Sequence, residues 1–83
     1  MQNPTALFTG QISTEHKSVF LTISDCNSPN IDGTDYEVEI ETSFADGSQD
    51  YELLEFHSDA LDDQEPTEIV QDWFGNDIAW SQA

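Results

Sequence analysis

The chain has 83 residues and a formal net charge of −17, because 18 aspartates and glutamates are set against one lysine and no arginine. So short a chain forms one small domain without room for a second core. Direct binding to nucleic acid is not expected, since that affinity is built from lysine and arginine contacts to phosphate. The acids are also unevenly placed: only Glu15 and Asp25 precede Ile31, and the other sixteen follow it.

Disorder and adaptation to high salt also produce acidic chains, and neither explains this one well. Nine aromatic residues and regular apolar alternation argue against disorder of the whole chain. Proteins of high-salt cytoplasm usually keep arginine for bidentate pairing. We therefore expect a folded domain over residues 1–83, with flexible segments at residues 1–5 and 58–65.

Nothing in the sequence indicates secretion or a membrane. The N-terminus lacks a basic segment followed by an apolar run. No apolar stretch approaches the roughly 20 residues that span a bilayer. With one lysine and no arginine, the chain is not expected to be attracted to anionic lipid, and the lone Cys26 allows no internal disulfide. We expect a soluble protein of the cytoplasm, which is the host cytoplasm if a phage encodes it.

The first half of the chain predicts a hairpin. Residues 7–13 and 18–24 are strand-like, and Val19, Leu21 and Ile23 alternate on one face of the second strand. Residues 26–35 form a long connection that contains Pro29 and Gly33.

The second predicted hairpin carries the strongest pattern. In residues 36–42, Tyr36, Val38 and Ile40 alternate with three glutamates, so apolar and acidic side chains occupy opposite faces. Asp46 and Gly47 form a favoured two-residue turn, and residues 49–56 return. That turn predicts that Glu41 pairs with Glu52 and that Tyr51 and Leu53 face the core.

A helix is predicted after the acidic segment 58–65. Pro66 suits its first position, Glu68 complements the helix dipole, and Gly75 can end it. A third hairpin over residues 69–80, turning at Gly75 and Asn76, is the alternative. The expected fold is α+β: an antiparallel sheet of about four strands from two hairpins, covered by one C-terminal helix.

The candidate site is the acidic face of the second hairpin. Alternate residues of a strand lie about 6.8 Å apart, which is comparable to the spacing of successive phosphates in a nucleic acid. The predicted partner-binding residues are Glu37, Glu39, Glu41, Asp50, Glu52 and Glu55. A secondary set in the following segment comprises Asp59, Asp62, Asp63 and Glu65, and the candidate aromatic anchors are Phe56 and Trp80.

Catalysis is not predicted. The two histidines, His16 and His57, belong to no recognisable nucleophile, phosphate-cradling or zinc motif, and so small a domain offers little room for a preformed pocket. Residues 28–39 partly match a calcium loop, but serine stands at the first ligand position. We predict no cofactor and no dedicated metal ligand; a calcium-binding module remains an alternative.

In length, acidity and carboxylates displayed on a compact β-rich domain, here Glu37, Glu39, Glu41, Asp50 and Glu52, the chain resembles the small DNA-mimic inhibitors of bacteriophages and mobile elements. That class includes anti-CRISPR and anti-restriction proteins and inhibitors of uracil-DNA glycosylase. The resemblance is one of character and not of an aligned motif, and the class shares no common fold.

The resemblance implies a non-enzymatic inhibitor that docks into the basic nucleic-acid channel of a host defence or repair complex, with a CRISPR effector as the first choice. We expect this chain to be a monomer or, through an apolar strand edge, a homodimer. The alternative is an interaction or assembly module that grips its partner through the aromatic C-terminal segment between Trp73 and Trp80.

Overall fold

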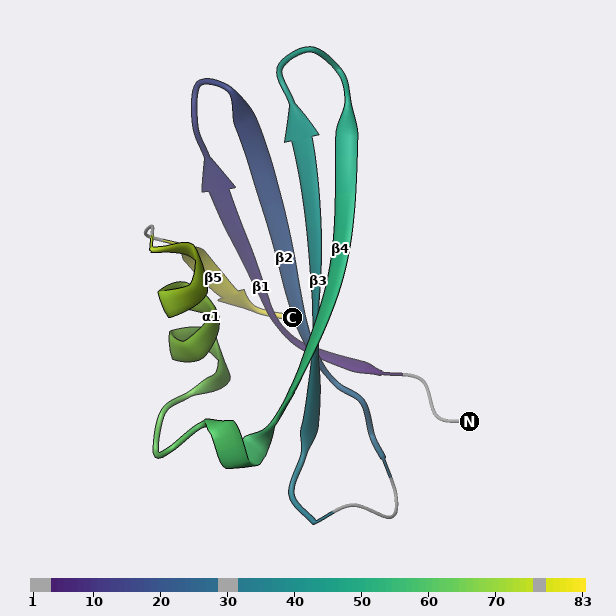
Figure 1. Ribbon diagram of the computed structural model, residues 1–83, viewed down its shortest axis with the longest axis vertical. Coiled ribbons are helices and arrows are strands. Elements are labelled where there is room, and N and C mark those ends of the chain that lie inside the picture. Colours follow the sequence, from purple (N-terminus) through teal and green to yellow (C-terminus); the bar gives the residue numbers. More distant parts are fainter. Residues whose placement is uncertain (1–3, 29–31, 76–77) are drawn as a thin grey trace.

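The computed structural model describes residues 4–28, 32–75 and 78–83 as one antiparallel sheet with a helix packed on it (Figure 1). The strands are β1 (Thr5–Ser13), β2 (Lys17–Asp25), β3 (Asp35–Phe44), β4 (Gln49–His57) and β5 (Ala79–Gln82). The short 3-10 helix η1 (Ser58–Ala60) and the helix α1 (Pro66–Phe74) lie between β4 and β5. The strand order is β4-β3-β2-β1-β5, so two consecutive hairpins form a meander and β5 returns to the far edge.

The predicted α+β class is confirmed, and the number of strands is corrected from about four to five. The additional strand β5 pairs with β1, and Trp80 lies opposite Gly10. A strand of four residues shows almost no periodicity of its own, so its pairing depends on a distant part of the chain.

The predicted helix is confirmed, and its ends follow from local signals. Pro66 is the first helical residue, where a missing backbone N–H costs nothing. Gly75 ends the helix at φ 65°, in the left-handed region, and donates a 3.0 Å hydrogen bond to the Gln71 carbonyl. The alternative hairpin is therefore wrong for residues up to Phe74, and Asn76 of its turn lies outside the described residues.

The β3–β4 loop differs from the predicted two-residue turn. The Gly47 amide donates to the Phe44 carbonyl at 3.0 Å, and the Phe44 amide donates to the Ser48 carbonyl at 2.9 Å. These bonds enclose three loop residues, 45–47, and the last of them, Gly47, has φ 91°. A type I turn closed by a left-handed glycine has this pattern. The extra loop residue shifts the register of β4 by one.

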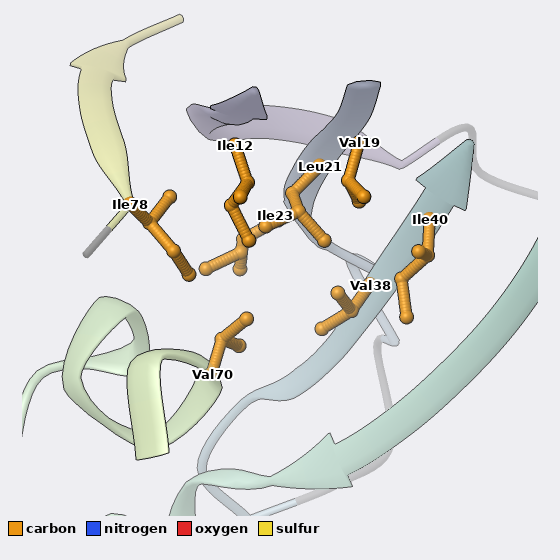
Figure 2. Packing of buried hydrophobic residues seen from close by; sticks show 8 residues of the cluster. All are labelled: Ile12, Val19, Leu21, Ile23, Val38, Ile40, Val70 and Ile78. Carbon is orange, nitrogen blue, oxygen red and sulfur yellow. The ribbon is translucent and has the colours of Figure 1, made fainter. Parts of the chain in front are cut away.

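The core lies between one face of the sheet and α1. Val70 of α1 points toward Ile23 of β2 and Val38 of β3, and all three side chains are buried (Figure 2). The rest of the buried apolar cluster is contributed by the strands and by the residue before β5: Ile12, Val19, Leu21, Ile40 and Ile78. The alternation predicted for Val19, Leu21 and Ile23 is confirmed, because paired residues of adjacent strands share a face.

Gly10 allows β5 to approach the sheet closely. A Cβ atom at this position would lie 2.6 Å from Cγ2 of Ile78 and 2.8 Å from the ring of Trp80. The Ile78 amide also donates to Oε1 of Gln71 at 3.1 Å, which connects the start of β5 to α1. The glycine and the helix together position the last strand.

The segment from β4 to α1 begins with an ordered turn. The Ser58 amide donates to the Thr34 carbonyl at 2.7 Å, and Nδ1 of His57 accepts a 3.0 Å bond from the Asp59 amide. Because Nδ1 is the acceptor, Nε2 carries the proton and donates to the Asp32 carbonyl at 2.7 Å. Flexibility of residues 58–65 stays a prediction, and residues 1–3 of the other predicted flexible segment lie outside the described part of the chain.

Candidate protein-interaction face

The face of the sheet opposite the core carries the candidate site. Residues paired across an antiparallel sheet point to the same side, so the register assigns each side chain to a face. We call the outward side of β2, β3 and β4 the open face. Its central members are Phe20, Thr22, Glu37, Glu39, Glu41, Tyr51, Leu53 and Glu55.

These side chains form rows that run across the strands. In the first row, Glu41 of β3 pairs with Phe20 of β2 and with Tyr51 of β4. In the second row, Glu39 pairs with Thr22 and with Leu53. Each row therefore places a glutamate between side chains of the neighbouring strands, whose Cβ atoms are about 5 Å away on either side.

The third row brings Glu37 of β3 directly opposite Glu55 of β4. Like charges at paired positions destabilise a sheet, so stability alone does not explain this arrangement. Glu37 and Glu55 belong to the predicted acidic face, and the register confirms that they share one side of the sheet with Glu39 and Glu41.

The register corrects the rest of the predicted face. Glu52 pairs with Ile40 and Asp50 pairs with Thr42, so both lie on the side of the sheet that carries the core residues. The predicted pairing of Glu41 with Glu52 is wrong. A shift of one residue moves every side chain of a strand to the other face, and the three-residue loop at 45–47 introduces that shift.

The same shift turns apolar side chains outward. Tyr51 and Leu53, which were expected in the core, are 56% and 45% exposed, and Phe20 is 45% exposed. The outward position of Phe20 was accessible from the sequence, because it alternates with Val19 and Leu21. The positions of Tyr51 and Leu53 were not, because they depend on the length of the loop.

The strands β3 and β4 carry carboxylates but neither lysine nor arginine. Four acids in β3 and three in β4 are accompanied by no lysine or arginine, whereas β1 and β2 together carry only Lys17 and Asp25. Within residues 4–28, 32–75 and 78–83, the one close contact between a basic side chain and a carboxylate is that of Nδ1 of His57 with Asp59, at 3.5 Å. It is not an ion pair, because this nitrogen accepts the bond from the Asp59 amide and carries no proton. Since β4 is an edge strand, Asp50 and Glu52 extend the negative charge around that edge to the other side.

Two titratable groups respond to this charge. Partial desolvation, followed by the negative potential of Glu39, Glu37 and Glu41, raises the pKa of the Tyr51 hydroxyl. Desolvation also raises the pKa of the Cys26 thiol, with contributions from Glu37, Glu55 and other nearby acids. Cys26 is therefore kept as a thiol and is not an activated nucleophile.

A shallow depression of about 350 Å³ adjoins the first row. Glu41 and Tyr51 border it on the open face, and Asp50 borders it from the opposite side of the hairpin. Its remaining lining residues are Thr42, Ser43 and Gln49. The hollow is thus bounded by two carboxylates and one aromatic ring.

The two candidate anchors, Phe56 and Trp80, are not free surface side chains. The ring of Phe56 stacks on Tyr36 with centroids 5.2 Å apart and meets Trp73 edge-on at 5.5 Å. Trp80 lies over Gly10, and both candidates are half-buried against the core. Their aromatic surface is used within the fold, whereas Phe20 and Tyr51 present theirs to solvent.

The secondary acidic set lies beyond the end of β4, in the connection to α1 (Figure 1). Asp59, Asp62, Asp63 and Glu65 are all exposed. Asp62 and Asp63 adopt left-handed backbone angles, with φ 46° and 67°. These acids extend the negative charge past one end of the sheet and do not belong to the open face.

No group of three metal-ligating side chains comes together among the described residues. Of the partial calcium loop, Asn30 lies outside the described residues, and Glu39 lies within β3 between Thr22 and Leu53. In the part of the chain that the structure describes, no helix has the length and apolarity needed to cross a membrane. No protein-family model matches the chain, and it has no significant match among curated proteins or solved structures.

Proposed function

We propose that this protein is a DNA-mimic inhibitor, which occupies a basic nucleic-acid-binding channel of a host defence or repair complex. The proposal depends above all on the seven carboxylates of β3 and β4, which no cation accompanies. Ordinary protein surfaces mix both signs of charge, because mixing relieves self-repulsion. A one-signed surface is suited to a partner of opposite sign.

The spacing of the open face supports a nucleic-acid-binding partner. Glu37, Glu39 and Glu41 follow one another along β3 at about 6.8 Å, a spacing that matches a nucleic-acid backbone. Nucleic acids also present flat π faces beside their phosphates, and channels for single strands bind both features. Phe20 and Tyr51 likewise present rings beside the glutamates.

Among such complexes, a CRISPR effector is the first choice of target, on the resemblance to small acidic inhibitors. Its guide–target duplex is held in a positively charged channel. The alternative of docking through the aromatic C-terminal segment is less favoured, because Trp80 is half-buried over Gly10. Trp73, at the start of the aromatic C-terminal segment, is 45% exposed and is the side chain through which this alternative would act.

The test uses two variants that each remove three negative charges. The first, E37Q/E39Q/E41Q, neutralises the open face. The matched control, E15Q/E68Q/D72N, neutralises exposed acids outside the strands β3 and β4. Wild-type protein on beads captures its partner from host lysate, and the affinity of the purified partner is then measured for all three proteins.

We expect the open-face variant to lose an order of magnitude or more in affinity, and the control to change by about twofold or less, because only contacts at the interface alter the bound state strongly. Circular dichroism verifies that both variants are folded. Equal losses in the two variants would show that net charge alone matters, and unchanged affinity of the open-face variant would contradict the proposal.

A further inference from the structure

The open face combines exposed apolar rings with carboxylates at paired positions. In the first row, Glu41 lies between Phe20 and Tyr51 on adjacent strands. Adjacent strands are about 4.8 Å apart, so the two rings are attached about 10 Å from each other with the carboxylate between them. Leu53 extends the apolar surface beside Glu39 in the second row.

This surface has the features of a docking site. Phe20, Tyr51 and Leu53 are each 45% exposed or more, although the core face of the same sheet buries most of its apolar side chains. Clustered exposed apolar side chains with a polar surround mark interaction surfaces. The hollow of about 350 Å³ beside Glu41 and Tyr51 offers room for an inserted side chain.

The negative charge of the open face determines which kind of partner can bind to it. Glu37, Glu39, Glu41 and Glu55 share the face with the rings, and no cation of the described chain pairs with them. A second copy of this chain would bring two sets of these carboxylates together. The complementary occupant is therefore a positively charged segment of another protein.

Between the two cationic side chains, arginine fits the rows better than lysine. A guanidinium is planar, so its face can stack on an aromatic ring while its edge donates two hydrogen bonds to a carboxylate. A cation within about 6 Å of a ring centroid is attracted by the ring. Because Phe20 and Tyr51 are the paired neighbours of Glu41 on either side, a guanidinium that binds Glu41 would be placed to contact both rings. A hydrated ammonium would gain less from stacking.

From these observations we infer that the open face is a docking surface for an arginine-rich segment of a protein partner, with a guanidinium held by Glu41 between the rings of Phe20 and Tyr51. Arginines at alternate positions of an extended segment would match the spacing of Glu37, Glu39 and Glu41. This inference deepens the proposed function, because it names the partner side chains that the acidic surface contacts.

The experiment compares two synthetic peptides by isothermal titration calorimetry with the full chain. In one peptide arginine alternates with serine, and in the other lysine replaces each arginine; both are acetylated and amidated. Two variants accompany the wild type: F20S/Y51S removes the rings, and F44S removes an exposed ring from the end of β3, off the paired rows.

We expect wild type to bind the arginine peptide roughly three- to tenfold more tightly than the lysine peptide, the range that stacking of one or two guanidinium groups contributes. F20S/Y51S should lose this preference and retain the weaker binding common to both peptides, and F44S should keep it. Changes in the NMR chemical shifts of Phe20 and Tyr51 in the wild type, on addition of the arginine peptide, give a second readout that needs no variant.

Equal affinity for the two peptides, no measurable binding of either, or a preference that survives F20S/Y51S would overturn the inference. A dimer in sedimentation experiments that F20S/Y51S dissociates would instead assign the face to a second copy. The peptide titration needs no nucleic-acid-binding protein, so a preference for arginine can be found even if the proposed inhibitor function is wrong. Conversely, the loss of partner binding in E37Q/E39Q/E41Q can stand where the arginine preference fails.

Discussion

Tyr51 reports which side chains share the open face, because its hydroxyl lies in the field of the β3 glutamates. Desolvation and Glu39, Glu37 and Glu41 raise its pKa, and Asp50 and Glu52 are not among the causes. Had the loop contained two residues, Tyr51 would point to the other side of the sheet. The titration of one side chain therefore tests the register of the whole strand.

We predict that E39Q/E41Q lowers the pKa of Tyr51 toward its ordinary value, whereas D50N/E52Q, which removes as many charges from the opposite face, leaves it nearly unchanged. The phenolate absorbance is followed in a Tyr36→Phe background, so that Tyr51 alone titrates. Equal shifts in the two variants would contradict the register.

The sign of the associated stability change follows from the direction of the shift. Because the pKa of Tyr51 is raised in the folded state, its contribution to stability is fully present below the unfolded pKa, and it is lost as the pH rises through the folded pKa. The wild type should therefore lose more stability than E39Q/E41Q in strongly alkaline solution. Chemical denaturation at several alkaline pH values measures the difference.

At the scale of elements, the sequence predicted those features that depend only on neighbouring residues, such as the ends of a helix and the alternation of a strand. Pro66 and Gly75 mark the ends of α1 in the sequence, and the alternation of β3 assigns its glutamates to one face. The face of β4 was mispredicted because one additional loop residue reverses it. β5 was missed because its pairing depends on Gly10, nearly seventy residues away in the chain, and not on its own four residues.

Gly10 links two elements, and we predict that Gly10→Ala destabilises the fold by about 1–3 kcal/mol, as overpacking of a core does. The added methyl group would meet Ile78 and Trp80 at 2.6–2.8 Å, so β5 would have to move away from β1. Urea denaturation gives the free energy of unfolding. Thr9→Ala, on the other face of β1, serves as the control, and an unchanged stability of Gly10→Ala would show that β5 does not pack as described.

At the scale of the whole molecule, the charge that the sheet carries is concentrated at its β3–β4 edge. β3 and β4 hold seven acids, whereas β1 and β2 hold one acid and one lysine. Carboxylates on both sides of β4 also discourage other strands from pairing with this open edge. Protection of the edge does not, however, require glutamates along β3 with exposed rings on the strands at either side. That arrangement favours a basic partner.

The central claim is that the acidic surface takes the place of nucleic acid, and mutual exclusion tests it most directly. The partner captured by the wild-type chain is purified, and its affinity for labelled DNA or RNA is measured at increasing concentrations of the chain. We predict that the apparent Kd for the nucleic acid rises in proportion to the concentration of the chain, and that no ternary complex forms. A ternary complex that binds the nucleic acid with unchanged affinity would contradict the account.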